Sequence, residues 1–398
     1  MDFMKTIIES ILDKMPDLTK VRKQFLIHIF ALIVSLRGRM NFLNMERQGR
    51  YSEKSYRLHF EQSFDHFTFN KHLIEAYCSG HKIIVTDCSY IPKSGKETPH
   101  IGKFWSGCAS KALKGLEISS LAVIDVDNNT GMHLECKQTT ASCNDEESRV
   151  DFYLQQVIDK KDELKQLANY IVADGAYAKQ KYVDGLLEKT ELHLISKLRK
   201  DADLTYLYTG EISKGRGRKK QYDGKMNCKQ IDKKRFELCC IDDDSYVYTA
   251  VVRSKFLKRN IRIAYVEYKK NNSYSILFST DTRLGGDFIY RYYKSRYQIE
   301  FLFRDSKQYT GLNHCQARSE NKLNFHFNAS LTAVSLSKAD SIFEEPLTEE
   351  VFSMCDIKSI NFNQLFLDRF IAISEIELSC NKIAEAYDEM LKFGRIAA

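Results

Sequence analysis

The sequence predicts an α/β protein in which a mixed-sheet core is interrupted by an all-β insertion and flanked by helical regions. Two short apolar runs, residues 82–87 and 170–174, each have the length of a buried strand and each end in an aspartate. A separate group of strand-like runs fills residues 235–279. Helical patterning dominates before residue 79 and after residue 335. Together these patterns favour a sheet with helices packed on it.

The composition is that of a folded protein with room for more than one core. The chain has 398 residues, of which 28% are charged and 43% hydrophobic, and these values exclude wholesale disorder. The longest apolar run, residues 25–36, is too short to cross a bilayer. The N-terminus lacks the pattern of a signal peptide, so we expect a cytoplasmic protein without membrane contact. None of the cysteines are spaced C-x-x-C, which argues against a structural zinc site.

Positive charge is concentrated in one segment. Residues 197–299 hold 24 Lys and Arg against 12 Asp and Glu, whereas residues 337–398 hold 6 against 12. The whole chain has a formal net charge of only +7. A basic segment of this kind is typical of a polyanion-binding surface, and we expect the acidic tail to face protein or solvent.

Residues 1–79 are expected to form a helical DNA-binding region of helix-turn-helix type. An apolar helix over residues 25–36 is followed by a Gly-containing turn, a short helix, and a further helix opened by Ser52 as N-cap. Lys54 and Arg57 on that last helix would approach bases or phosphates if the helix lay in a major groove. A plain helical domain is the alternative.

The first part of the predicted core, residues 80–196, contains both strands that end in an acid. A buried strand of this design places a carboxylate on a rigid element. A lone strand-end Asp is often only a turn residue or a cap. Two such strands, ending in Asp87 and Asp174, are stronger evidence for a shared site than one.

Residues 197–284 are predicted to be all-β, with a flexible basic loop ahead of the main strands. The cations of this loop are Arg216, Arg218, Lys219 and Lys220. A basic loop is usually just solvated. Next to an all-β segment of net positive charge, this one is better suited to follow a phosphate backbone.

The stretch from Tyr293 to Lys307 contains no Pro or Gly and predicts a single helix ended by Gly311, a residue suited to a left-handed C-cap. At about 100° per residue, one face carries an acid, three cations and a phenol within an arc of about 80°. These residues are Tyr293, Arg296, Glu300, Arg304 and Lys307. A solvated salt-bridge face would mix the signs more evenly. We therefore interpret the face as a carboxylate surrounded by phosphate-binding groups.

Asp87, Asp174 and Glu300 stand on three rigid elements. Carboxylate oxygens are the ligands that Mg²⁺ prefers, and two Mg²⁺ ions held a few ångströms apart promote phosphoryl transfer. Three acids among 53 mean little by themselves. Their order along the chain is informative, because two strand-end aspartates are followed by a basic insertion and then by a helical glutamate.

The helix also carries a recognisable motif. Y-x2-R-x3-E-x6-K is matched without gaps by Tyr293, Arg296, Glu300 and Lys307. With this motif, the chain resembles the bacterial insertion-sequence DDE transposases that have an RNase H-like catalytic domain, a β-strand insertion and the Y-R-E-K signature. Residues 86–89 and 172–177 resemble the two Asp motifs of that group, and residues 196–202 its basic strand end before the insertion. The resemblance covers roughly residues 80 to 330.

The resemblance implies a role for each candidate residue. Asp87, Asp174 and Glu300 would bind two Mg²⁺ ions, for which Mn²⁺ can substitute. The phosphate beside the cut would be held by Tyr293, Arg296, Lys307 and Arg199. Residues 285–335 would complete the catalytic core, and residues 336–398 would form a helical C-terminal region that is a candidate for dimerisation.

The implied function is cut-and-paste transposition. The protein would bind the inverted-repeat ends of its insertion sequence, hydrolyse the phosphodiester there, and join the 3′-OH ends to target DNA, in this group usually through a DNA hairpin. The partners would be double-stranded DNA and a second copy of the chain. The expected location is the bacterial cytoplasm, in association with the nucleoid. The alternatives are a catalytically idle DNA-binding derivative and an RNase H-like nuclease without strand transfer.

One aromatic residue expected from the resemblance is not identified by the sequence. Relatives stack a flipped base on an aromatic residue of the β-insertion, often Trp. The only Trp here, Trp105, follows the first Asp and is expected to serve packing and not chemistry. Tyr246, Tyr248 and Phe256 are the candidates within the insertion, and the sequence does not choose among them.

Overall fold

The computed structural model describes residues 2–140, 148–211, 217–271, 273–344, 352–375 and 381–395. The helices are α1 (Asp2–Leu12), α2 (Lys20–Ser35), α3 (Phe42–Gln48), α4 (Glu53–Glu61), α5 (His66–Tyr77), α6 (Arg149–Ile158), α7 (Lys161–Leu167), α8 (Gln180–Thr190), α9 (Gly286–Ser295), α10 (Tyr297–Gln308), α11 (Glu320–Glu344), α12 (Met354–Ser374) and α13 (Asn381–Leu391). The strands are β1 (Lys82–Pro92), β2 (Gly102–Ser106), β3 (Lys111–Asp125), β4 (Thr130–Gln138), β5 (Tyr170–Val172), β6 (His193–Leu198), β7 (Leu204–Leu207), β8 (Tyr222–Lys225), β9 (Glu237–Asp242), β10 (Ser245–Ser254), β11 (Arg259–Tyr268) and β12 (Tyr274–Ser279).

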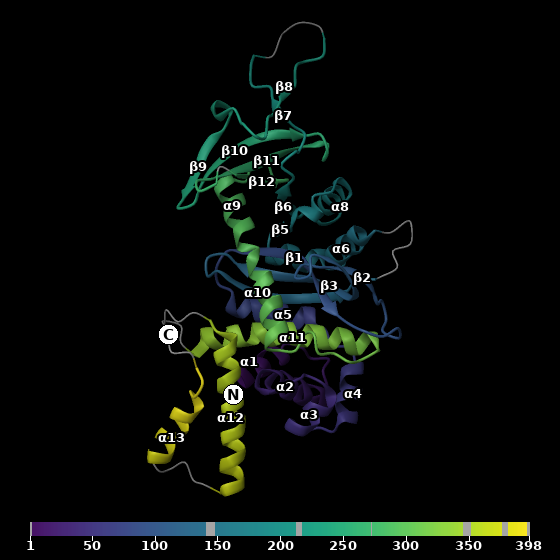
Figure 1. The fold of residues 1–398 in the computed structure, drawn as a ribbon, viewed down its shortest axis with the longest axis vertical. Coiled ribbons are helices and arrows are strands. Elements are labelled where there is room, and N and C mark those ends of the chain that lie inside the picture. Colours follow the sequence, from purple (N-terminus) through teal and green to yellow (C-terminus); the bar gives the residue numbers. More distant parts are fainter. Residues whose placement is uncertain are drawn as a thin grey trace.

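One mixed sheet runs through the molecule (Figure 1). Its strands follow the order β2-β3-β1-β5-β6-β12-β11-β10-β7-β8, with β4 paired to β3 and β9 to β10. β3 pairs antiparallel with both β4 and β1, whereas β5 and β6 run parallel to β1. The predicted α/β fold with a mixed sheet is thereby confirmed, with three antiparallel strands followed by two parallel ones.

The strands of the insertion extend the core sheet. β12 pairs antiparallel with β6, and Phe278 lies opposite Ser196. β11 and β10 continue the same sheet outward, and β7, β8 and β9 complete it. The all-β character predicted for this segment agrees with the structure, while the domain boundaries at residues 197 and 284 remain predictions.

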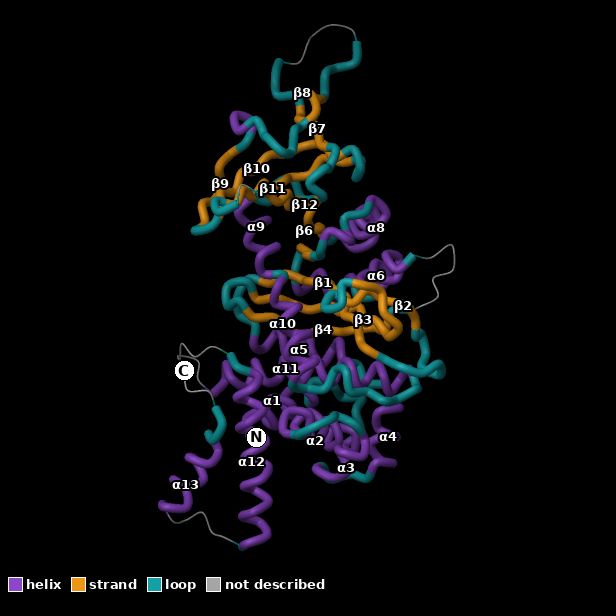
Figure 2. Tube along the Cα trace, viewed as in Figure 1, coloured by secondary structure: helices purple, strands orange, loops and turns teal. Residues whose placement is uncertain are grey.

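Helices α9 and α10 connect the two halves of the sheet. α9 packs on β10, β11 and β12, and α10 packs on β1, β3 and β4 before the chain reaches α11. Figure 1 shows this pair running lengthwise from the insertion strands down to α11. Most helices gather around α11 at one end of the molecule, and the insertion strands lie at the other (Figure 2). The long axis therefore passes from helices, through the core sheet, to the insertion.

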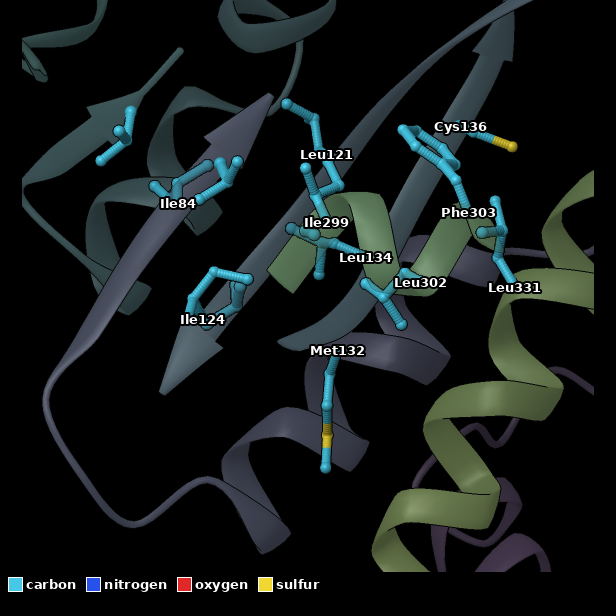
Figure 3. Close-up of a cluster of buried hydrophobic side chains, with 14 of the residues drawn as sticks. Ile84, Leu121, Ile124, Met132, Leu134, Cys136, Ile299, Leu302, Phe303 and Leu331 are labelled. Atoms are coloured by element: carbon cyan, nitrogen blue, oxygen red, sulfur yellow. The ribbon is translucent and has the colours of Figure 1, made fainter. Parts of the chain in front are cut away.

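The apolar side of α10 is part of the main core. Ile299, Leu302 and Phe303 are buried and lie among side chains of β1, β3 and β4 (Figure 3). Burial of each such side chain contributes about 1.5–3 kcal/mol. This packing fixes the rotation of α10 about its axis, and so it decides which side of the helix presents Glu300.

The N-terminal helices follow the predicted pattern of short helices and turns. The hydroxyl of Ser52 accepts a hydrogen bond from the backbone N–H of Ser55 at 3.3 Å, which makes it the N-cap expected for α4. α3 and α4 pack against each other, and α4 also contacts α11. In the described part of the chain, no helix has the length and apolar character needed to cross a membrane.

Candidate active site

The register of the sheet brings the two predicted aspartates side by side. The expectation that the first strand ends in Asp87 is wrong, because β1 continues to Pro92 and Asp87 lies within it, opposite Ser120 of β3. In the parallel pair of β1 and β5, Val85 lies opposite Val172, and each is followed two residues later by an aspartate. The carboxylate of Asp87 accepts a hydrogen bond from the N–H of Cys88 at 2.8 Å. Asp174 accepts one from the N–H of Ala176 at 2.8 Å and begins a turn of 3₁₀-helix. Both carboxylates are therefore held by their own backbone at the same edge of the sheet.

Arg296 joins the first aspartate to the helical glutamate. Its Nη1 donates to Oδ2 of Asp87 at 3.2 Å, and its Nη2 donates to Oε1 of Glu300 at 2.8 Å. The Arg296 side chain is only 10% exposed, and its guanidinium carbon lies 5.8 Å from the ring centroid of Tyr293 and 5.6 Å from that of Tyr297. The guanidinium thus sits between two carboxylates and two aromatic rings.

The helix that carries these groups is interrupted, which corrects the prediction of one unbroken helix from Tyr293. α9 ends at Ser295 and α10 begins at Tyr297. At the junction Arg296 N–H bonds to the carbonyl of Tyr293, and Ile299 N–H bonds to the carbonyl of Arg296. These i to i+3 bonds tighten the turn while Arg296 keeps right-handed helical angles.

The far end of the helix partly agrees with the prediction. Gly311 has a φ of +76°, the left-handed conformation expected from its position. α10 nevertheless ends three residues earlier, at Gln308.

Burial and neighbouring charges shift the pKa values of Asp87 and Tyr293 in the site. The pKa of Asp87 is raised to about 6, mainly by burial and to a lesser extent by the charges of Asp174 and Glu300, while Arg296 and the hydrogen bond from the Cys88 N–H oppose the rise. Burial also raises the pKa of Tyr293, again with Arg296 acting in the opposite direction. An anionic Asp87 therefore needs a nearby cation, and Arg296 supplies that charge here.

Lys307 and Arg199 lie on two elements that adjoin the cluster, Lys307 on α10 seven residues after Glu300 and Arg199 directly after β6. Lys307 is half-buried near the end of α10, where burial lowers its pKa and Cys108 is the neighbour that opposes the shift. Arg199 is exposed directly after β6, whose end lies at the same edge of the sheet as Asp174 because β5 and β6 are parallel. Among the described residues, neither is a hydrogen-bond partner of Asp87, Glu300 or Arg296.

The predicted DNA contacts outside the core lie far from the carboxylates. Lys54 and Arg57 are exposed on α4, and Arg57 is paired with Glu53. The described basic-loop residues Arg218, Lys219 and Lys220 are exposed just before β8. Arg216 lies outside the described residues. Figure 1 places α4 and β8 towards opposite ends of the molecule, so a DNA that touched both would have to run along its whole length.

The aromatic candidates differ in exposure. Trp105 is 62% exposed, so the expectation of a packing role is wrong. It stands on β2, which pairs with only one end of β3 and leaves the indole without a covering layer. Phe256 is 61% exposed and Tyr246 is 38% exposed, whereas Tyr248 is half-buried under Lys233.

The sequence interpretation passed over two features of the site. The ring of Tyr297 lies against the Arg296 guanidinium, and the hydroxyl of Tyr177 lies next to the thiol of Cys88. Tyr297 directly follows Arg296 in the motif, and that adjacency was an available signal. The contact between Cys88 and Tyr177 depends on the parallel pairing of β1 and β5, which no local pattern reveals.

The donor chemistry of the site fits a hard divalent cation. In the part of the chain that the structure describes, no three His, Cys, Asp or Glu side chains form a metal-binding group. Two carboxylates converge instead on the Arg296 guanidinium, and Asp174 is close enough to raise the pKa of Asp87. Carboxylate oxygens already gathered around one positive charge are suitable ligands for Mg²⁺ or Mn²⁺.

Comparison with known proteins identifies the class. A family model described as "Transposase DDE domain" matches residues 82–336, which span both parts of the predicted core and the insertion between them. The chain belongs to this family, and its enzyme class is a DNA-cleaving transposase.

Two other comparisons add less. No curated protein matches the chain. Among solved structures, the chain is similar to a piggyBac transposase in a synaptic complex with hairpin DNA, at 11% sequence identity and a TM-score of 0.42. The similarity covers 93% of this chain and 76% of the other.

Proposed function

We propose that the protein is a cut-and-paste transposase that binds the inverted-repeat ends of its own element, cleaves them, and joins the 3′-OH ends to target DNA. The observation that carries this proposal is the convergence of Asp87 and Glu300 on Arg296 beside Asp174, in a chain of the transposase DDE family. The carboxylates come from three separate elements of the fold, which are β1, the turn after β5 and α10.

In this proposal Asp87, Asp174 and Glu300 hold two Mg²⁺ ions, and Mn²⁺ can substitute. When bound, two such ions lower the barrier to phosphoryl transfer by activating the attacking oxygen and stabilising the leaving one. Arg296, Lys307 and Arg199 would hold the DNA phosphates, since cationic side chains form strong hydrogen bonds to phosphate oxygens. The phenol of Tyr293 would donate to the same phosphate. Hydrolysis requires no covalent intermediate between protein and DNA.

The register of the insertion favours Tyr246 as the residue that stacks on a flipped base during hairpin formation. Tyr246 lies opposite Glu267, and Glu267 lies opposite Tyr274, whose hydroxyl donates to the carbonyl of Lys200 just after β6. The register therefore places Tyr246 level with the C-terminal ends of β5 and β6. Phe256 lies at the opposite edge, in the turn between β10 and β11.

A homodimer is proposed for the synaptic complex, because two transposon ends must be held together. α12 offers the surface: Phe366, Phe370 and Ile373 are exposed at spacings of four and three residues, which places them along one side of the helix. Exposed apolar residues in such a row commonly mark a protein contact. The complex would act in the bacterial cytoplasm, on nucleoid DNA.

The cleavage reaction is tested with a plasmid carrying the DNA that flanks this reading frame, including its terminal repeats. Glu300→Gln should abolish Mg²⁺-dependent nicking while leaving retention of the same DNA on the protein unchanged. Glu188→Gln, an exposed residue of α8, is the matched control and should cut normally. Cutting by Glu300→Gln at the normal rate would refute the proposal.

Two other outcomes would identify the alternative functions. DNA retention by the unaltered protein without any metal-dependent cleavage would indicate an idle DNA-binding derivative. Cleavage without joined products in a strand-transfer assay would indicate a nuclease.

A further inference from the structure

Arg296 occupies the position in which a catalytic cation would be expected. The Nη1 atom of its guanidinium donates to Asp87 and the Nη2 atom donates to Glu300, so a single side chain pairs with both carboxylates. These two residues are on different elements and lie 213 positions apart in the chain, a difference read from their numbers. An arginine four residues from a helix-borne acid could have turned outward to solvent, but this one is directed inward.

The surroundings of the guanidinium form a built site. Tyr293 and Tyr297 flank it with their rings, and aromatic faces attract a cation. Its Nε–H is buried and has no hydrogen-bond partner in the described residues. Two of its nitrogens thus bind carboxylates while the third lacks an acceptor, so the guanidinium retains donor capacity that a phosphate oxygen would use.

The same carboxylate oxygens cannot hold a guanidinium and a divalent cation at full strength. Glu300 Oε1 and Asp87 Oδ2 already accept from Arg296 at 2.8 and 3.2 Å. Direct ligation would place the metal where these hydrogen bonds now run.

We infer that Arg296 is an internal counter-ion that competes with the divalent cation for Asp87 and Glu300, and that a DNA phosphate relieves this competition by drawing the guanidinium away. The inference rests on the proposed function and adds a form of regulation: without DNA the protein binds metal weakly, and DNA and metal bind cooperatively. Linkage requires the effect to be reciprocal, so DNA strengthens metal binding by the factor by which metal strengthens DNA binding.

The test measures Mn²⁺ binding to the protein without DNA, by the loss of the free Mn²⁺ electron paramagnetic resonance signal. Arg296→Gln should bind Mn²⁺ at least about tenfold more tightly than the unaltered protein, a difference equivalent to about 1.4 kcal/mol. Arg304→Gln is the matched control, because Arg304 lies on the same helix and pairs with Asp305 instead of the catalytic acids. It removes the same charge, and its Mn²⁺ affinity should change less than about threefold.

A second variant protects the test against misfolding. Arg296→Lys keeps the charge but cannot reach two carboxylates through a planar fork. Its Mn²⁺ affinity should therefore fall between that of Arg304→Gln and that of Arg296→Gln. If Arg296→Gln does not fold, Arg296→Lys compared with Arg304→Gln decides the question alone. Equal or weaker Mn²⁺ binding in the Arg296 variants, or no detectable binding in any of them, would overturn the inference.

Cooperativity is tested with a 5′-phosphorylated duplex carrying the terminal repeat. The duplex should tighten Mn²⁺ binding to the unaltered protein and have a smaller effect on Arg296→Gln. An equal effect on both would refute the coupling. These measurements do not depend on cleavage: a normal result for Glu300→Gln in the nicking assay would remove the proposed function, while unchanged Mn²⁺ affinity in Arg296→Gln would remove only the counter-ion role.

Discussion

The hydroxyl of Tyr177 lies 3.3 Å from the thiol of Cys88. Cys88 directly follows Asp87, the first candidate aspartate, and Tyr177 follows Asp174, the second, by three residues. Tyr177 is buried and packs on Tyr182, with ring centroids 5.3 Å apart. This contact ties the turn after β5 to β1 and so helps to set the separation of Asp87 and Asp174.

Tyr177→Phe removes this link while keeping the ring. We expect a loss of about 1 kcal/mol in the free energy of unfolding, the usual net value of one hydrogen bond, together with slower DNA cleavage. Tyr182→Phe is the control, because the Tyr182 hydroxyl is buried without a hydrogen-bond partner among the described residues. Removing that hydroxyl should leave stability unchanged or raise it. Urea unfolding of both variants measures the difference, and equal losses would show that the contact contributes nothing specific.

Tyr246 and Phe256 allow the base-stacking assignment to be tested. Tyr246→Ala should let nicked DNA accumulate at the expense of hairpin, because stacking on an aromatic ring contributes about 1–3 kcal/mol per base. Phe256→Ala, at the opposite edge of the sheet, should leave the ratio of hairpin to nicked product unchanged. Denaturing gels of end-labelled substrate report both species. The opposite pattern would place the flipped base at the other edge.

Lys338 predicts a pH dependence of stability. Its ammonium is buried in α11 and donates to the carbonyl of Gly131 at 2.8 Å, and burial lowers its pKa from 10.5 to about 8. Between these two values the unfolded chain holds more protons than the folded one, so the contribution of Lys338 to stability rises with pH and is lost as pH falls towards 8.

Lys338→Met removes this titration. Relative to the unaltered protein, the variant should be most stable at pH 8 and below, and its relative stability should decline up to pH 10.5. The slope should not exceed about 1.4 kcal/mol per pH unit. Chemical unfolding at several pH values gives the difference directly. A difference that stays constant with pH would mean that the buried ammonium keeps its ordinary titration.

The apolar row on α12 predicts a defined effect on self-association. Phe370→Glu should weaken the dimer by at least about tenfold, because it would bury an unpaired charge in the interface. Leu238→Glu places the same charge at an exposed apolar site on β9 and should not affect association. Analytical ultracentrifugation with end DNA measures both. Dimers of unchanged affinity in Phe370→Glu would locate the interface elsewhere.

The candidate carboxylates could be predicted from the sequence because each has a local signal. A short apolar run ending in Asp marks Asp87 and Asp174, and the spacing of the Y-R-E-K motif marks Glu300. Sequence patterns of this kind also predicted the mixed sheet, since the lengths of the apolar runs and their order along the chain can be read from the sequence.

The features that the sequence did not reveal are long-range contacts. Arg296 faces Asp87 across a separation of 209 residues, and β12 pairs with β6 only after the chain has formed the insertion. The backbone angles of Arg296 remain helical, so the tight turn there needs no Gly or Pro that would have predicted it from the sequence. The exposure of the Trp105 side chain depends on how β2 pairs with β3, and the spacing of residues in the sequence does not reveal this pairing.

The ladder between β12 and β6 has a consequence for anyone who wishes to shorten this protein. Excising residues 204–268 would remove β11, the partner of β12, and leave a row of open backbone N–H and C=O groups facing solvent. An unpaired edge strand of this kind pairs with strands from other molecules. A truncated protein of this kind would therefore aggregate even if its three carboxylates stayed in place. By pairing with β12, the outer strands also protect the rest of the sheet from aggregation.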